Sequence, residues 1–216
     1  MLCYDKSISP LNKVCQRIFI CFLQQFFQNV LLLFHLYAII AVYIDEFAVS
    51  ERFFMNENQK DDIYYMRRAL ELARKAYDMG EVPVGAVAVW EGEIVGEGMN
   101  LRETGKNALL HAEISAIDSA CKKLGGWRLH KCTLYVTLEP CPMCAGAIIN
   151  SRVRRVVFGA REERAGAFGS ITDINSLPLN HRAEVTSGVL EQECKALMQD
   201  FFADLREKRK KSSSDQ

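Results

Sequence analysis

The sequence predicts an α/β protein built as a layered sheet with helical crossovers, and two observations support this prediction. After residue 55, strand-like and helix-like segments follow one another in the order strand, helix, strand, helix, strand. This order is typical of sheets whose strands are joined by helices packed on their faces. The chain also contains enough apolar material for such a core, since 49% of its 216 residues are hydrophobic.

The first expected element is a helix, because apolar residues recur at helical spacing from Ile63 to Tyr77. Gly80 follows as a stop signal. The run over 84–90 is almost wholly apolar, which favours a strand covered on both faces. Residues 91–93 read Glu-Gly-Glu and predict a turn, so a second strand that starts at Ile94 would complete a hairpin.

The later elements follow from the same patterns of apolar spacing and β-branched residues. They are a helix from Ile114 to Leu124, a strand over 133–137, a helix over 142–151, a strand over 153–158, loops and short turns over 160–183, a last strand over 184–186 and a final amphipathic helix from Cys194 to Leu205. Residues 207–216 are predicted to be a basic, polar C-terminal tail.

Residues 1–54 form a hydrophobic N-terminal extension that differs from the rest of the chain. The stretch from Ile18 to Ile44 has no charge and is long enough to span a bilayer, although Gln and Asn residues interrupt it. Basic residues precede it and acidic residues follow it, so the positive-inside tendency would place everything after residue 45 outside the cell.

Three explanations of this extension remain open. It could be a membrane anchor, a signal peptide with a poor cleavage site at 48–50, or upstream sequence ahead of a true start at Met55. We favour the upstream sequence, and we expect no membrane association, because an anchor would place everything after residue 45 outside the cell.

Charge and cysteine content narrow the possible partners. Lys plus Arg and Asp plus Glu both number 27, so there is no overall basic field, and a nucleic-acid partner would need a local patch. The 8 cysteines are scattered except for the close pair Cys141 and Cys144. This pattern favours a reduced compartment and one metal or redox site.

Two short motifs carry the chemistry: His111-Ala112-Glu113 and Pro140-Cys141-Pro142-Met143-Cys144. Each is predicted to open a helix. The two cysteines are three residues apart at a helix start, where the positive helix end favours thiolates. Together with His111 they make three metal ligands, which leaves a fourth tetrahedral position open for water, as in catalytic zinc sites.

Glu113 is the expected proton carrier. Two thiolates cancel the charge of Zn²⁺, so the metal alone acidifies water less than a site of neutral histidines would. A carboxylate beside the site can take the proton and return it to the leaving group. Structural zinc would require a fourth Cys or His ligand in a matching pair, and a redox dithiol would not require His111 and Glu113.

The pair of motifs, H-x-E and P-C-x-x-C, resembles the known signature of the cytidine deaminase superfamily. The resemblance is most specific to bacterial tRNA-specific adenosine deaminases and covers about residues 60–206. Five further motifs carry it: E-V-P-V-G-A over 81–86, G-M-N over 98–100, L-Y-V-T-L-E-P over 134–140, V-V-F-G-A-R over 156–161 and N-H-R over 180–182.

The resemblance implies a three-layer α/β/α fold around a five-stranded mixed sheet, with residues 55–206 as a zinc-dependent deaminase domain. It implies conversion of the wobble adenosine in the anticodon of an arginine tRNA to inosine, by zinc-activated water attacking C6 with Glu113 as the proton shuttle. It also implies one Zn²⁺ per subunit, a cytoplasmic homodimer and the tRNA anticodon stem-loop as partner.

The resemblance also assigns residues to the substrate. Asn100 would contact the purine, and the backbone of Ala112 would help hold it. Phe202 and Arg206 would lie along the RNA path, whereas core packing explains the neighbouring Phe201 better. Glu162 stands where many family members carry Asp, so any contact it makes with the target nucleotide would have a longer reach.

Two other functions are compatible with the motifs. A deaminase of free guanine or of cytosine nucleosides would share the zinc motif and would act without a folded anticodon loop. A zinc-stabilised binding module would keep the three ligands but would not depend on Glu113.

Overall fold

The computed structural model describes residues 62–214, so the predictions made for residues 1–54 lie outside the described residues. The elements, in chain order, are a helix over 62–78 (called helix 62–78), β1 (Gly85–Trp90), β2 (Glu93–Met99), α2 (Ala112–Leu124), β3 (Cys132–Leu138), α3 (Pro142–Asn150), β4 (Arg155–Ala160), the short 3₁₀ helix η1 (Ile174–Ser176), β5 (Glu184–Ser187) and α4 (Glu191–Ser214). No helix within 62–214 combines the length and the apolar character needed to cross a bilayer.

The strands form one mixed sheet in the order β2-β1-β3-β4-β5. β1 is antiparallel to both β2 and β3, whereas β3, β4 and β5 are parallel to one another. The predicted hairpin is present, and Glu91 and Gly92 at its tip both have positive φ, 50° and 84°. Positive φ at both central residues is the requirement of a type I′ turn, whose twist matches that of the paired strands.

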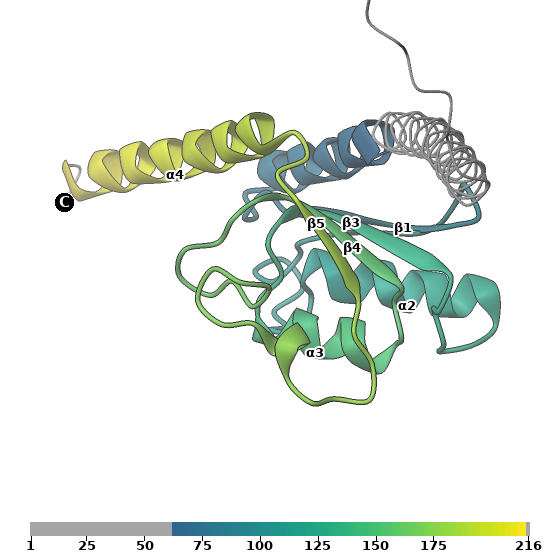
Figure 1. Cartoon of the computed structure of the whole chain (residues 1–216). Helices are drawn as coiled ribbons and strands as arrows, with labels where there is room; N and C mark the ends of the chain where they lie inside the picture. Colours follow the sequence, from purple (N-terminus) through teal and green to yellow (C-terminus); the bar gives the residue numbers. More distant parts are fainter. Residues whose placement is uncertain (1–61, 215–216) are drawn as a thin grey trace, which may run out of the picture. The chain divides into compact units, whose positions relative to one another are not determined.

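Helices cover both faces of the sheet, as Figure 1 shows. Alternate residues of the central strands pack with α2 and α3 on one face; Ala86, Leu134 and Val156 are examples. The intervening residues, such as Val87, pack with helix 62–78 and the start of α4 on the other face. The predicted three-layer α/β/α fold is therefore confirmed, and the double covering explains why β1 is apolar at successive positions.

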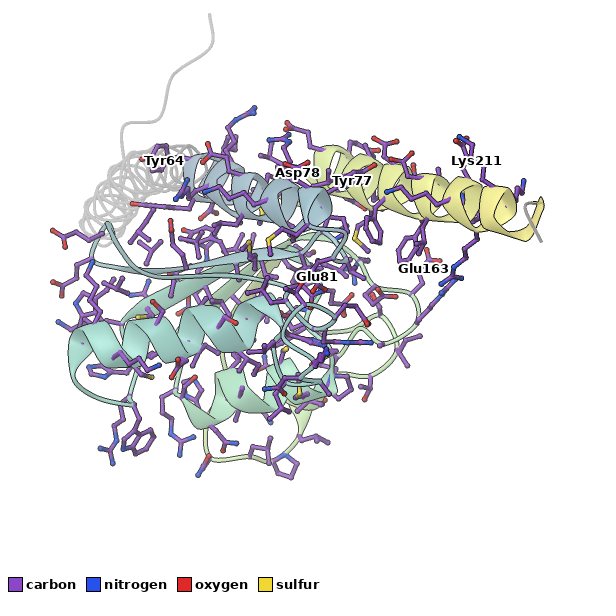
Figure 2. All side chains as sticks on the ribbon, turned by 180° about the vertical axis from the view of Figure 1, so that it is seen from behind. Tyr64, Tyr77, Asp78, Glu81, Glu163 and Lys211 are labelled. Atoms are coloured by element: carbon purple, nitrogen blue, oxygen red, sulfur yellow. The ribbon has the colours of Figure 1, made fainter. Side chains whose placement is uncertain are left out.

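α4 is longer than the predicted final helix and remains helical through Ser214, so residues 207–214 continue it. Tyr77 of helix 62–78, labelled in Figure 2, donates a hydrogen bond of 2.5 Å from its Oη to Asp204 Oδ2 of α4. The ring of Phe201 packs edge-on against Tyr77 with the ring centres 5.5 Å apart. Phe201 is buried, as expected of a core residue, and Phe202 beside it is exposed.

The glycines of β2 allow α2 to lie unusually close to the sheet. A Cβ atom built on Gly98 would lie 2.2 Å from the carbonyl oxygen of Ala112 and 2.6 Å from the backbone nitrogen of Ala116. Gly96 is equally close to the next turn of α2, 2.2 Å from the carbonyl oxygen of Ala116. These obstacles are backbone atoms and cannot rotate away, so a side chain here must displace the helix.

We expect Gly98→Ala to destabilise the protein by about 1–3 kcal/mol, the usual cost of overpacking a core. Because Gly98 lies against the first turn of α2, the same change should move His111 and weaken metal binding. Thermal unfolding and metal content measured on the purified variant test this. Gly146→Ala is the matched control, since a Cβ at Gly146 meets nothing within 4 Å; equal behaviour of the two variants would contradict the prediction.

Candidate active site

The candidate site lies at one edge of the sheet, where several strands end together. Because β1 is antiparallel to β2 and β3, and β4 is parallel to β3, the carboxyl ends of β2, β3 and β4 meet at the same edge. Leu138 pairs with Ala160, so β3 and β4 end side by side. Open α/β sheets commonly bind ligands at such an edge.

A cavity of about 200 Å³ opens there. It is smaller than the roughly 300–1,000 Å³ that drug-sized ligands occupy, which suits one small ring better than a larger molecule. Its walls come from the segment before β1, the ends of β2, β3 and β4, and the starts of α2 and α3. The lining residues are Val82, Val84, Asn100, Arg102, His111, Ala112, Glu113, Leu138, Glu139, Cys141, Glu162 and Ala165.

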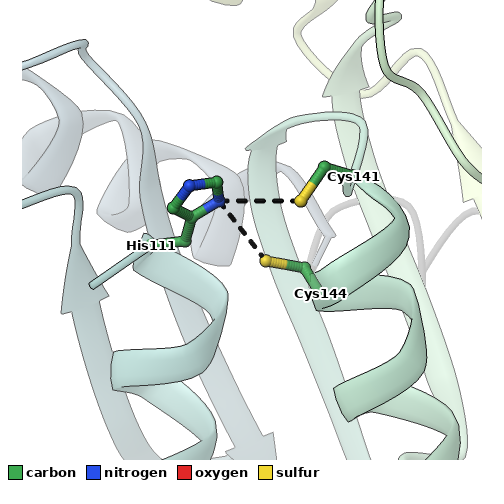
Figure 3. A group of neighbouring side chains, drawn as sticks. All are labelled: His111, Cys141 and Cys144. Atoms are coloured by element: carbon green, nitrogen blue, oxygen red, sulfur yellow. Dashed lines mark hydrogen bonds between the residues drawn. The ribbon is translucent and has the colours of Figure 1, made fainter. Parts of the chain in front are cut away.

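The three predicted metal ligands converge at this edge (Figure 3). His111 Nδ1 lies 3.7 Å from Cys141 Sγ and 3.6 Å from Cys144 Sγ. A tetrahedral zinc with ordinary Zn–N and Zn–S bonds would hold its nitrogen and sulfur ligands about 3.6 Å apart. Both nitrogen–sulfur distances therefore fit one zinc ion, and the three donor atoms all lie within 4.8 Å of one another.

Local structure brings these ligands together. His111 is the N-cap of α2 and Cys141 the N-cap of α3, both with extended backbone angles. Pro142 starts α3, where its missing N–H costs no hydrogen bond, and Cys144 follows within the first turn. The two helix starts are adjacent because β3 leads directly into α3 and α2 packs on the same face of the sheet.

The two thiols differ in how readily they lose a proton. A hydrogen bond from Cys144 lowers the pKa of Cys141 to about 4, helped by His111 and opposed by burial. The same hydrogen bond, together with burial, raises the pKa of Cys144. Negative charge is thus already favoured at Cys141, and a bound divalent cation would favour loss of the second proton as well.

Glu113 lies in the first turn of α2, is only 4% exposed, and lines the cavity without belonging to the three-residue metal group. Burial raises its pKa, and the negative charge of Cys141 adds to this effect. A carboxyl group whose pKa is raised is a stronger base once it is ionised, which favours taking up a proton during the reaction. This placement agrees with the shuttle role predicted for it.

The predicted substrate residues divide into two groups. Asn100, Ala112 and Glu162 line the cavity. Phe202 and Arg206 do not line it; they are exposed on α4. If these two residues contact substrate, they contact a part that extends beyond the cavity.

Sequence reasoning missed one buried acid beside the cavity, Glu81, and two charged residues at its lining, the buried acid Glu139 and the cation Arg102. Burial opposes ionisation of Glu81, but backbone N–H groups of Thr104 and Glu103 lower its pKa below the ordinary value. The signal that could have found Glu81 and Glu139 was their position within the motifs over 81–86 and 134–140.

Comparison with known proteins identifies the family. A model of the MafB19-like deaminases matches residues 60–206. The chain is 53% identical over 150 residues to the tRNA-specific adenosine deaminase of Bacillus subtilis, which covers 69% of this chain and 93% of the relative. The chain belongs to the tRNA-specific adenosine deaminase family. The corresponding protein of Haemophilus influenzae is 50% identical over 147 residues, covering 67% of this chain and 85% of that protein.

Solved structures agree with this family membership. A tRNA:A34 deaminase studied for A-to-I editing at the wobble position shares 41% identity with a TM-score of 0.61, covering 62% of this chain and 98% of that one. The guanine deaminase of Nitrosomonas europaea shares 30% identity with a TM-score of 0.55, covering 65% and 84%. The chain is thus a deaminase, and its greater identity is to the tRNA-acting relatives.

Proposed function

We propose that this deaminase converts the wobble adenosine of a tRNA anticodon, in an arginine tRNA, to inosine. The observation that carries the proposal is the arrangement of His111, Cys141 and Cys144 beside Glu113 in a cavity of about 200 Å³. The identity to curated tRNA-specific adenosine deaminases supports the choice of substrate.

The ligand set fits zinc, one ion in each chain, because thiolate and imidazole donors favour zinc and three protein ligands leave one position open. When bound, the metal supplies Lewis-acid activation of a water molecule. Glu113 takes one proton from the attacking water onto a carboxylate oxygen and returns it to the ring nitrogen next to C6. It then takes a second proton, from the hydroxyl formed at C6, and gives it to the amine, which leaves as ammonia. Burial of Glu113 excludes bulk water from this transfer.

The base is held by residues on two sides of the reacting centre. Asn100 is buried, and its Nδ2 donates to Glu81 Oε2 at 3.3 Å, so its amide is held in place. We propose that Asn100 contacts the purine and that the backbone of Ala112 supports it. Glu162 also lines the cavity, and we propose that it meets the ribose or backbone of the target nucleotide.

The rest of the RNA would lie outside the cavity, along α4. Anticodon loops present unstacked bases that can enter a pocket with little unpairing. Phe202 offers an exposed ring, and Arg206 begins a basic helical segment that continues with Lys208, Arg209, Lys210 and Lys211. Stacking on an aromatic ring and neutralisation of phosphates are the two usual sources of affinity for single-stranded loops.

We further propose a cytoplasmic homodimer. The proposed cytoplasmic location follows from the proposed substrate, because tRNA is processed there. The loop after β4 exposes three large apolar side chains, Ile171, Leu177 and Leu179, which a second copy could cover. Sedimentation of the purified protein tests this: a dimeric mass is expected, and a monomer at micromolar concentration would refute it.

Deamination of free guanine is the second candidate, supported by the 30% identity to the guanine deaminase of Nitrosomonas europaea. The two candidates share the metal chemistry and differ in whether a folded RNA loop is needed. Phe202 and Arg206, which lie outside the cavity lining, have no role in binding a free base.

An inosine assay separates the candidates. The full chain, and residues 55–216 separately, would be incubated with an arginine tRNA that carries adenosine at the wobble position. The same tRNA with guanosine there is the control, and free adenosine, guanine and cytidine are the competing substrates. We expect inosine in the adenosine-containing tRNA alone. Turnover of a free base or nucleoside with the tRNA unchanged would overturn the substrate assignment.

A further inference from the structure

Two buried carboxylates have no role in the chemistry proposed above: Glu139, which lines the cavity, and Glu81, which is outside its lining. Glu81 is 0% exposed and Glu139 2% exposed, and neither belongs to the metal group. Burying a carboxylate is costly unless several donors point at it. Both acids meet this condition, and in each case most of the donors come from one loop that lines the cavity.

Glu81 lies between helix 62–78 and β1 (Figure 2) and holds the loop that follows β2. Its Oε1 accepts the backbone N–H of Thr104 at 2.6 Å, and its Oε2 accepts that of Glu103 at 3.2 Å. The Oε2 atom also accepts from Asn100 Nδ2. One carboxylate therefore fixes both the substrate-facing Asn100 and the course of the loop that carries Arg102.

Glu139 holds the loop that follows β4 in the same way. Its Oε1 accepts the backbone N–H of Phe168 at 3.0 Å and that of Ser170 at 3.1 Å. Its Oε2 accepts the backbone N–H of Glu162 at 3.2 Å and the hydroxyl of Ser170. The loop closes on the carboxylate so tightly that a Cβ on Gly166 would lie 2.6 Å from Glu139 Cδ.

These two loops flank the reacting centre. In the strand order β2-β1-β3-β4, the loop held by Glu81 follows β2 and the loop held by Glu139 follows β4, on either side of the central pair. The first loop supplies Asn100 and Arg102 to the cavity lining, and the second supplies Glu162 and Ala165. The positions of these lining side chains therefore depend on the hydrogen bonds that Glu81 and Glu139 accept from the two loops.

We propose that Glu81 and Glu139 are positioning residues that shape the two sides of the substrate cavity before the nucleotide binds. Glu81 accepts two backbone N–H groups and Glu139 accepts three, so each loop keeps its shape without a substrate to order it. Misplacing a substrate-positioning group by about 1 Å can cost up to a hundredfold in rate. The inference rests on the deaminase function proposed above.

The test compares Glu81→Gln and Glu139→Gln in the full, zinc-loaded chain. Glutamine has nearly the same size but turns an N–H₂ group toward donors that need an acceptor. We expect kcat on the anticodon stem-loop to fall by about tenfold to a hundredfold in each variant, with a smaller change in KM and an unchanged zinc content. Glu97→Gln is the matched control, because Glu97 accepts two hydrogen bonds from Arg68 and does not line the cavity.

Hydrogen exchange of the substrate-free protein gives a second readout that a general loss of stability would not reproduce. Glu81→Gln should accelerate exchange at Glu103 and Thr104 only, and Glu139→Gln at Glu162, Phe168 and Ser170 only. If Glu139→Gln does not fold, Ser170→Ala removes a single hydrogen bond and should show a weaker effect on the same loop. Glu81→Asp, which keeps the charge but shortens its reach, serves the same purpose for the other loop.

The outcomes of the positioning test and of the function test can be told apart. If the wild-type chain forms inosine in tRNA while both Gln variants match it within twofold and leave loop exchange unchanged, the positioning role is wrong and the function stands. If the wild-type chain leaves tRNA unchanged, the proposed substrate is wrong; the exchange pattern then still reports whether the two acids hold the loops.

Discussion

Replacing Glu113 by Gln should lower the rate of inosine formation by about a thousandfold or more. General acid–base groups contribute factors of about 10² to 10⁴, and here one residue serves as both the acceptor and the donor of the proton. Glutamine keeps the shape of the side chain but cannot take up a proton at neutral pH. Because Glu113 is outside the metal group, the variant should bind as much zinc as the wild type.

Single-turnover deamination, together with metal analysis of the same preparation, measures this effect. The rate loss should appear in kcat, with binding of the anticodon stem-loop nearly unchanged. Turnover close to that of wild type would show that Glu113 is not the proton carrier. Loss of zinc along with activity would instead make Glu113 part of the metal site, which contradicts the role assigned to it.

The second large effect is expected from the metal ligands. Cys144→Ser replaces a buried thiol by a hydroxyl of similar shape that is a poor zinc ligand. We expect the variant to lose most of its zinc and nearly all activity, because only His111 and Cys141 remain to hold the ion. Since the site joins the starts of α2 and α3, binding of zinc should also stabilise the fold.

Metal analysis, activity and thermal unfolding with and without a chelator check this prediction. A chelator should lower the unfolding temperature of the wild type and leave that of Cys144→Ser unchanged. Cys121→Ser is the matched control, because Cys121 is half-buried in the last turns of α2 and forms no disulfide. Equal zinc content in Cys144→Ser and Cys121→Ser would refute the ligand assignment.

Much of the fold could be predicted from local patterns. Apolar spacing from Ile63 to Tyr77 indicated a helix, and the structure has one over 62–78. The acidic turn around Gly92 indicated a hairpin, and β1 and β2 form it. The largest difference concerns the C-terminal end of the last helix, which was expected at Leu205, whereas α4 continues through Ser214. A charged segment with no apolar face gives no periodic signal even where it continues a helix.

The metal group could be predicted for a different reason. Cys141 and Cys144 are one helical turn apart at a helix start, so their proximity is a local property. His111 is thirty residues earlier, and only the pairing of motif types indicated that it joins them. For Phe201 the sequence favoured core packing over RNA contact, and its burial against Tyr77 agrees with core packing.

The sequence by itself determined the order of elements, the ligand types and the deaminase signature, since these depend on residue types at short spacing. Only the tertiary structure decided which loops flank the cavity, because the strand order joins segments that are far apart in the chain. It also decided the place of Glu81 and Glu139. In a sequence, a buried carboxylate cannot be distinguished from a solvated one, and only the surrounding N–H groups show the difference.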